Sequence, residues 1–364
     1  MPGFKTTIQG KTTSWLVWFM FIGVIPSIAG MGGLAGAVAE AGNTMFPLLS
    51  TEIWVAISCL LTWLLLYYGS YKSLEKTLLV MVLFFSFMTM VIAFAMQSTE
   101  YQVNLNQISQ GLSFSFPTEY LPLALAVFGF TGISYGEIMA YTYWCLEKGY
   151  ADNTGQDIEE TKNWIKTMQT DVWVTVFFIT LGTLPFFVLG AGVLNNVPEL
   201  QESLATSSFW DVDVISSLQN MFSLVLGGWA KWLFIILAFF VLFSTLLSGT
   251  AAFTRTISDY LISMGLVKEK TDTRQMLIKL VAFVIPFLSG LFYFILPNPI
   301  TLLLIAGIWA AIGLPIVNIG ALYLVTKLDP ALQPKLITKF ILWLSLFLQL
   351  SLAALIVYDI SLNF

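Results

Sequence analysis

A single carboxylate lies inside the fourth long apolar stretch of this sequence, beside an unusual density of glycine. Glu137 follows Gly129, Gly132 and Gly136 in the segment 128–138. On insertion scales a carboxylate at the centre of a membrane helix costs about 2.5–3.5 kcal/mol, and each glycine costs a helix about 1 kcal/mol relative to alanine. No other acidic residue falls well inside an apolar stretch. A costly carboxylate of this kind indicates a functional site.

The chemistry predicted for this segment is cation binding at a break in a helix. We expect the backbone to unwind between Thr131 and Gly136, with Glu137 in the first turn of the helix that follows. Transporters build cation sites from the carbonyl groups that such breaks release, together with a carboxylate. These oxygens suit hard divalent cations such as Mg²⁺ and Mn²⁺. In the alternative interpretation, Gly132 and Gly136 form a GxxxG pair that only lets two helices pack, and Glu137 is a structural partner of another polar group.

The composition indicates an all-α integral membrane protein with a single transmembrane domain over residues 1–364. Hydrophobic residues make up 57% of the chain and charged residues only 10%, whereas a soluble protein carries about 25% charged residues. The absence of histidine excludes histidine-based metal sites and proton relays. We expect no enzyme, no cofactor and no nucleic-acid partner, since the sequence carries no nucleophile–base pair. Cys59 and Cys145 are expected to be buried, reduced thiols.

Nine apolar stretches are long enough to cross a bilayer as helices, since a span needs about 20 residues. They comprise residues 14–38, 53–68, 78–96, 121–145, 172–194, 226–247, 276–296, 300–325 and 337–358. The longest predicted loop on the basic side, 146–170, has room only for a short amphipathic helix at about 158–168.

The basic residues support this count, because they alternate between the two sets of loops. Of the 16 Lys and Arg residues, only Lys231 falls in the second set. The first set holds Lys5, Lys11, Lys72, Lys76, Lys148, Lys162, Lys166, Arg255, Lys268, Lys270, Arg274, Lys279, Lys327, Lys335 and Lys339. Basic loops face the cytoplasm. We therefore expect a multi-pass protein of the cell membrane, in contact with the lipid bilayer, with its N-terminus cytoplasmic and its C-terminus outside.

Four weaker signals lie in other predicted spans. The glycine-rich segment 30–36 favours close helix packing over local unwinding. The hydroxyls of 244–250 either bond back to their own helix or line a substrate path. Arg255 and Asp259 are four residues apart and are expected to pair. Pro315 and Asn318 indicate either a plain proline kink or a kink with a polar lining residue.

The segment 131–137, continuing through 140–150, resembles the Nramp family (natural resistance-associated macrophage proteins) of divalent metal transporters. The residues Thr131-Gly132-Ile133-Ser134-Tyr135-Gly136-Glu137 carry most of this resemblance. The segments 244–250 and 314–315 are similar to parts of the family's eighth and tenth helices. The resemblance extends over nearly the whole chain and identifies a divergent branch.

The resemblance implies a LeuT-type fold of two inverted five-helix repeats, with a metal site between the broken first and sixth helices. The family's Met-Pro-His-Asn motif falls on residues 134–137, so Ser134 replaces the metal-ligating Met, Gly136 the His and Glu137 the Asn. A further carbonyl ligand would be that of Thr131. Loss of a thioether and gain of a carboxylate shift the expected preference toward Mg²⁺ or Mn²⁺ as the transported substrate.

Two departures from the family pattern follow from the same alignment. The Asp and Glu of the family's proton route fall near Met31 and Leu34, so ordinary proton coupling is not expected. The family's first two helices, with an Asp-Pro-Gly-Asn motif, have no counterpart, which implies either a truncated product or a separate segment that supplies them. Two alternatives to metal transport remain open: a LeuT-type transporter of an amino acid or amine, and a fragment that does not transport.

The charge pattern generates a topology prediction. We expect a cysteine placed in the loop 97–119 to react with a membrane-impermeant thiol reagent outside intact cells, because that loop belongs to the set with one basic residue. A cysteine placed in 154–162 is expected to react only after the cells are opened. Labelling in the reverse order would contradict the orientation.

Overall fold

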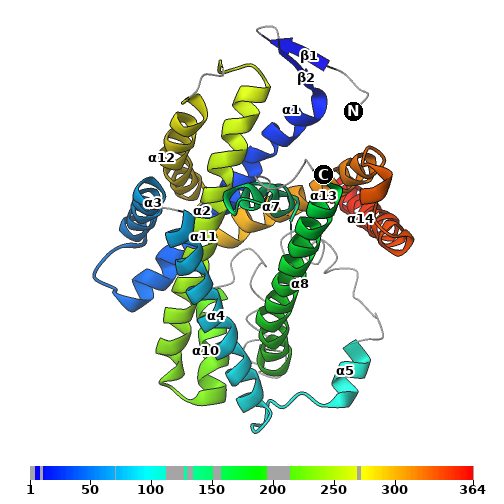
Figure 1. Ribbon diagram of the computed structural model, residues 1–364. Coiled ribbons are helices and arrows are strands. Elements are labelled where there is room, and N and C mark those ends of the chain that lie inside the picture. Colours follow the sequence, from blue (N-terminus) through cyan, green and yellow to red (C-terminus); the bar gives the residue numbers. More distant parts are fainter. Residues whose placement is uncertain are drawn as a thin grey trace.

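The computed structural model describes residues 5–8, 11–69, 71–111, 127–128, 134–150, 157–194, 214–268 and 272–363. Apart from one short hairpin, regular structure in these residues is helical (Figure 1). The hairpin pairs β1 (Lys5–Ile8) with β2 (Lys11–Ser14) in antiparallel register. The Thr13 hydroxyl donates a hydrogen bond of 2.7 Å to the carbonyl of Ser263, which ties the hairpin to the end of α11.

The described helices divide into long apolar helices and shorter segments. The long ones are α2 (Val24–Met45, which continues α1, Trp15–Ile22), α3 (Thr51–Tyr68), α4 (Tyr71–Met96), α8 (Ile158–Leu189), α11 (Ala230–Ser263), α12 (Thr273–Ile295), α13 (Pro299–Val325) and α14 (Leu336–Asn363). The shorter ones are α5 (Leu105–Gly111), α7 (Tyr135–Glu147), η2 (Gly190–Leu194), α10 (Val214–Leu226) and η4 (Pro330–Leu332). In the described residues, eight helices are long and apolar enough to cross a membrane.

These eight helices confirm the class, an all-α multi-pass membrane protein, and eight of the nine predicted spans. Of the remaining span, 121–145, residues 127–128 and 134–145 are described, and the other residues lie outside the described part of the chain. The two largest boundary errors are in α8 and α11. Helix α8 begins at Ile158, so the separate amphipathic helix predicted at 158–168 is its first part, and α11 continues to Ser263 instead of ending at 247. Both helices persist beyond their apolar stretches, because a helix does not end where the hydrocarbon ends.

Helix α2 lies at the centre of the packing, against α3, α11, α12 and α13. Its glycines permit this. A Cβ atom on Gly32 would lie 2.5 Å from the carbonyl oxygen of Ser289 in α12, and one on Gly33 would lie 2.5 Å from that of Pro299 in α13. A Cβ on Gly36 would collide with the Tyr293 ring. The segment 30–36 is helical throughout, so close packing is confirmed and local unwinding there was wrong.

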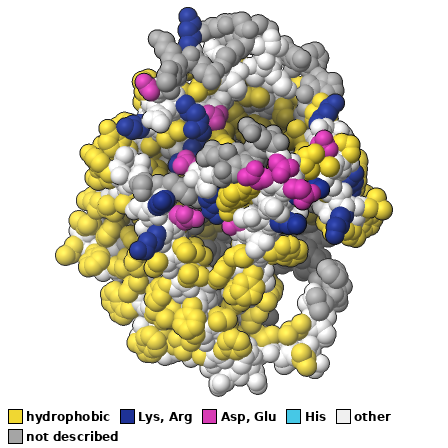
Figure 2. Space-filling model, in the orientation of Figure 1, with side chains coloured by type: hydrophobic (Ala, Val, Ile, Leu, Met, Phe, Trp, Pro, Cys, Tyr) yellow, Lys and Arg dark blue, Asp and Glu magenta, His cyan; other side chains and the backbone are white. Residues whose placement is uncertain are grey.

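The surface separates charged from apolar side chains. Charged side chains gather in a band across the upper half of the molecule, whereas the lower half is almost entirely apolar in this view (Figure 2). Large apolar residues that face outward include Phe94, Phe187 and Phe347, which are 71%, 70% and 66% exposed. Such surfaces are stable in lipid and would aggregate in water.

The packing of α2 generates a stability prediction. Gly33→Ala is expected to destabilise the protein by about 1–3 kcal/mol, because the added methyl group meets a backbone oxygen that cannot rotate away. Gly111→Ala is the matched control, since no atom of the described residues lies within 4 Å of its Cβ position. Thermal unfolding in detergent measures both. Equal midpoints for the two variants would contradict the close approach of α2 to α13.

Candidate functional site

Helix α7 begins beside the predicted cation site. Its N-cap, Ser134, has an extended backbone (φ −77°, ψ 170°), and the helix starts at Tyr135. A continuous helix through this point is therefore ruled out, and Glu137 lies in the first helical turn as predicted. The preceding residues 129–133 lie outside the described part of the chain.

The Glu137 carboxylate closes a capping box with Ser134. Its Oε2 atom accepts a hydrogen bond of 2.6 Å from the Ser134 backbone N–H and a short one from the Ser134 hydroxyl. Such a box satisfies backbone donors at a helix start that have no partner within the helix. The structural role that the sequence left as an alternative for Glu137 is thus present in the structure.

The structure brings together some of the predicted site residues. Ser134 and Glu137 are in direct contact, and a Cβ on Gly136 would lie 3.6 Å from the Ser134 hydroxyl oxygen. Thr131 and Gly132 lie outside the described residues. A carboxylate has about four acceptor positions, and both cap bonds go to Oε2, so Oε1 has no hydrogen-bond partner among the described residues.

Tyr135 anchors the start of α7, a role that the sequence did not reveal. Its buried hydroxyl donates a 3.3 Å hydrogen bond to the Gly23 carbonyl and lies 3.3 Å from the hydroxyl oxygen of Ser27. Its ring packs on Gly313 of α13, where a Cβ would come within 2.7 Å. These contacts place the site beside the α1–α2 junction and α13. A tyrosine inside an apolar segment was the available signal, because its hydroxyl needs a partner.

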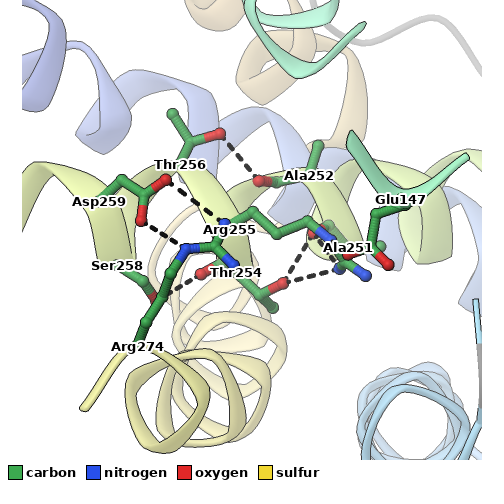
Figure 3. A network of polar contacts seen from close by, with 9 residues as sticks. All are labelled: Glu147, Ala251, Ala252, Thr254, Arg255, Thr256, Ser258, Asp259 and Arg274. Carbon is green, nitrogen blue, oxygen red and sulfur yellow. Dashed lines mark hydrogen bonds and ion pairs between the residues drawn. The ribbon is translucent and has the colours of Figure 1, made fainter. Parts of the chain in front are cut away.

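The other end of α7 is held by ion pairs. Glu147 accepts a 3.0 Å hydrogen bond from Nε of Arg255 in α11, and Arg255 lies over the Trp144 ring. Asp259 instead pairs with Arg274 of α12, at 2.8 Å (Figure 3). The predicted pair between Arg255 and Asp259 was therefore wrong: each residue has a partner on another helix.

A second ion pair connects α7 to α8. The Lys148 ammonium lies 3.2 Å from both carboxylate oxygens of Asp171 and 3.9 Å from a carboxylate oxygen of Glu75 in α4. The Tyr141 hydroxyl lies 3.4 Å from Asp171 as well. The end of α7 thus contacts α4, α8 and α11 through charged groups, whereas the described contacts of Tyr135 at its start are with neutral groups and backbone.

The weaker candidates have structural roles. The hydroxyls of Ser244, Thr245 and Thr250 donate to carbonyls of α11 itself, as one alternative predicted. Helix α13 continues through Pro315, and the Asn318 amide donates a 3.1 Å hydrogen bond to Gln349 of α14.

The positions near which the family resemblance places the Asp and Glu of the proton route are apolar. Leu34 is buried in the core, and the Met31 thioether packs against Gly249, so neither side chain can carry a proton. Glu40 lies inside α2, because that helix extends to Met45. Glu137 is therefore not the only acidic residue within an apolar helix.

Among the described residues, no three His, Cys, Asp or Glu side chains could hold a metal ion together.

The anchor at Tyr135 generates a prediction about stability. Tyr135→Phe removes a buried hydroxyl and its hydrogen bond to Gly23, and is expected to cost about 1 kcal/mol. Tyr68→Phe, on a side chain that is 79% exposed, is the control and should change stability by less than about 0.5 kcal/mol. Thermal unfolding of both variants in detergent tests the difference. An unchanged Tyr135→Phe protein would contradict the anchor.

Comparison with known protein families agrees with the membrane fold. No curated protein matches the chain. The family model described as "Natural resistance-associated macrophage protein-like" matches residues 5–359, which is nearly the whole chain. The protein is therefore a member of the Nramp family of divalent metal transporters.

Proposed function

We propose that this transporter moves hard divalent cations of the Mg²⁺ and Mn²⁺ class, and that Glu137 is a ligand of the transported ion. The Thr131 carbonyl and the Ser134 hydroxyl are the proposed further ligands, with Gly132 and Gly136 allowing the ion to approach the backbone. The family consists of divalent metal transporters, so the identity of the ion and of its ligands is what the proposal adds.

The observation that carries the proposal is the position of Glu137 in the first turn of α7. The start of a helix carries a partial positive charge of about half a unit, which by itself repels a cation. A carboxylate in that turn reverses the local sign. Because Oε2 makes the cap and Oε1 has no partner among the described residues, the same side chain can hold the helix start and offer an oxygen to an ion.

The choice of ion follows from the chemistry of the donors. Carboxylate, hydroxyl and carbonyl oxygens favour Mg²⁺ and Mn²⁺, whereas a thioether favours softer ions. The family resemblance implies that Ser134 replaces a metal-ligating methionine. A site with oxygen donors alone is expected to discriminate against Cd²⁺-like ions.

Glu137→Gln tests the ligand role. Glutamine also fits the third position of a capping box, so the variant is expected to fold and express normally. The variant removes the negative charge of the side chain. Loss of a residue that only hydrogen-bonds to a metal ligand lowers metal affinity at least roughly 10-fold, and loss of a ligand is expected to lower it further. Uptake of Mn²⁺ and Mg²⁺ into proteoliposomes is compared for the native protein and the variant. Unchanged uptake of both ions would remove Glu137 from the site.

Further arms of this experiment address the remaining alternatives. Ser134→Met is expected to raise uptake of Cd²⁺, because it restores a soft donor. Uptake that appears only when two further apolar helices are co-expressed would support a separate segment. Transport of an amine or amino acid, with no uptake of metal under either condition, would replace the proposal with the LeuT-type organic transporter.

A further inference from the structure

A cavity lies at the opposite end of α7 from Glu137, where α3 and α7 end and α12 begins. It has a volume of about 380 Å³ and is open to the surface. Among the described residues, three cationic side chains line it, Arg255, Arg274 and Lys279, whereas Glu147 is the one carboxylate. Three of these four residues, Arg255, Arg274 and Glu147, are drawn in Figure 3.

The ion pairs around the cavity leave positive charge uncompensated. Glu147 neutralises Arg255 and Asp259 neutralises Arg274. Lys279 has no carboxylate partner among the described residues, and its ammonium lies 5.6 Å from the centroid of the Tyr67 ring. An ammonium held over an aromatic face keeps its full charge and its hydrogen-bond donors.

Each of the two guanidinium groups also has an N–H group without a partner among the described residues. Arg255 uses Nε and Nη1 for Glu147, the Ala251 carbonyl and the Thr254 hydroxyl, and its side chain is only 12% exposed. Its Nη2 has no partner within the described part of the chain. Arg274 uses Nε and Nη2 for Asp259, which leaves Nη1. The existing pairs hold both groups in place, so a further acceptor would meet donors that are already ordered.

The remaining lining is suited to the edge of a bilayer. Leu65, Leu66 and Ala282 supply apolar surface, and Tyr67 supplies an amphipathic ring of the kind found at headgroup level. Basic cavities between membrane helices on the cytoplasmic side bind the headgroups of anionic lipids. A metal ion does not fit here, because three cations surround the space.

We propose that this cavity binds a phosphate group, through Lys279 and the free N–H groups of Arg255 and Arg274. An anionic phospholipid headgroup and free inorganic phosphate share this chemistry. The cavity does not include Glu137, so this proposal can be tested independently of the transport proposal.

Lys279→Gln is the decisive variant, because Lys279 has no carboxylate partner among the described residues and its removal leaves none of their carboxylates unpaired. Lys327→Gln is the matched control: Lys327 also lies 5.6 Å from a tyrosine ring, that of Tyr323, but outside this cavity. Native mass spectrometry of the full chain in detergent measures binding of phosphatidic acid, with phosphatidylcholine for comparison. Calorimetry with inorganic phosphate forms a separate arm.

Lys279→Gln is expected to weaken binding about 10-fold, as expected for loss of a charged hydrogen bond, while Lys327→Gln and Lys279→Arg bind as the native protein does. If Lys279→Gln weakens binding of phosphatidic acid alone, the site binds a lipid headgroup. If it weakens binding of inorganic phosphate, the site binds free phosphate. Equal effects of the glutamine variants at 279 and 327, or no preference for phosphatidic acid over phosphatidylcholine together with no binding of inorganic phosphate, would overturn the proposal.

Discussion

The close approach of the α2 backbone to α12 and α13 is the constraint on which the rest of the structure depends. Lipid chains are as apolar as leucine, so helices in a bilayer gain little from hiding apolar side chains and associate largely through contact at short range. Gly32 and Gly33 make that contact possible against Ser289 and Pro299. The junction of α2 with α1 lies at Gly23, and the carbonyl of Gly23 accepts the hydrogen bond from Tyr135.

Helix α7 is consequently placed by two different kinds of interaction. Its start is fixed by a neutral hydroxyl, a ring and a capping box, which tolerate an apolar environment. Its end is fixed by Glu147 and Lys148, whose charges need partners. Thirteen residues are too few for a stable isolated helix, so these contacts and not intrinsic propensity hold α7. The position of Glu137 is a result of both attachments.

Hydropathy alone predicted the class of fold and eight of the spans, because the thickness of the hydrocarbon core sets the length of apolar stretches. It could not predict where α8 begins or where α11 ends, since polar residues continue a helix in water as well. The spacing of Arg255 and Asp259 predicted a local pair, whereas α7 and α12 supply the partners that are found. Tertiary neighbours of this kind leave no trace in local spacing. The start of α7 was predictable, because a carboxylate three residues after a serine is a capping signature.

The length of α11 has a mechanical consequence. Its 34 residues extend about 51 Å, against a hydrocarbon core of about 30 Å. The part that extends past the apolar stretch carries the attachments of the hairpin, α7 and α12 at Ser263, Arg255 and Asp259. A rigid rod of this length acts as a lever: a tilt of about 5° around one end moves the other end by roughly 4 Å, given the rise per residue of a helix. Any reorientation of α11 within the bilayer would therefore displace the hairpin, α7 and α12 together, because all three are attached to the same end of the helix.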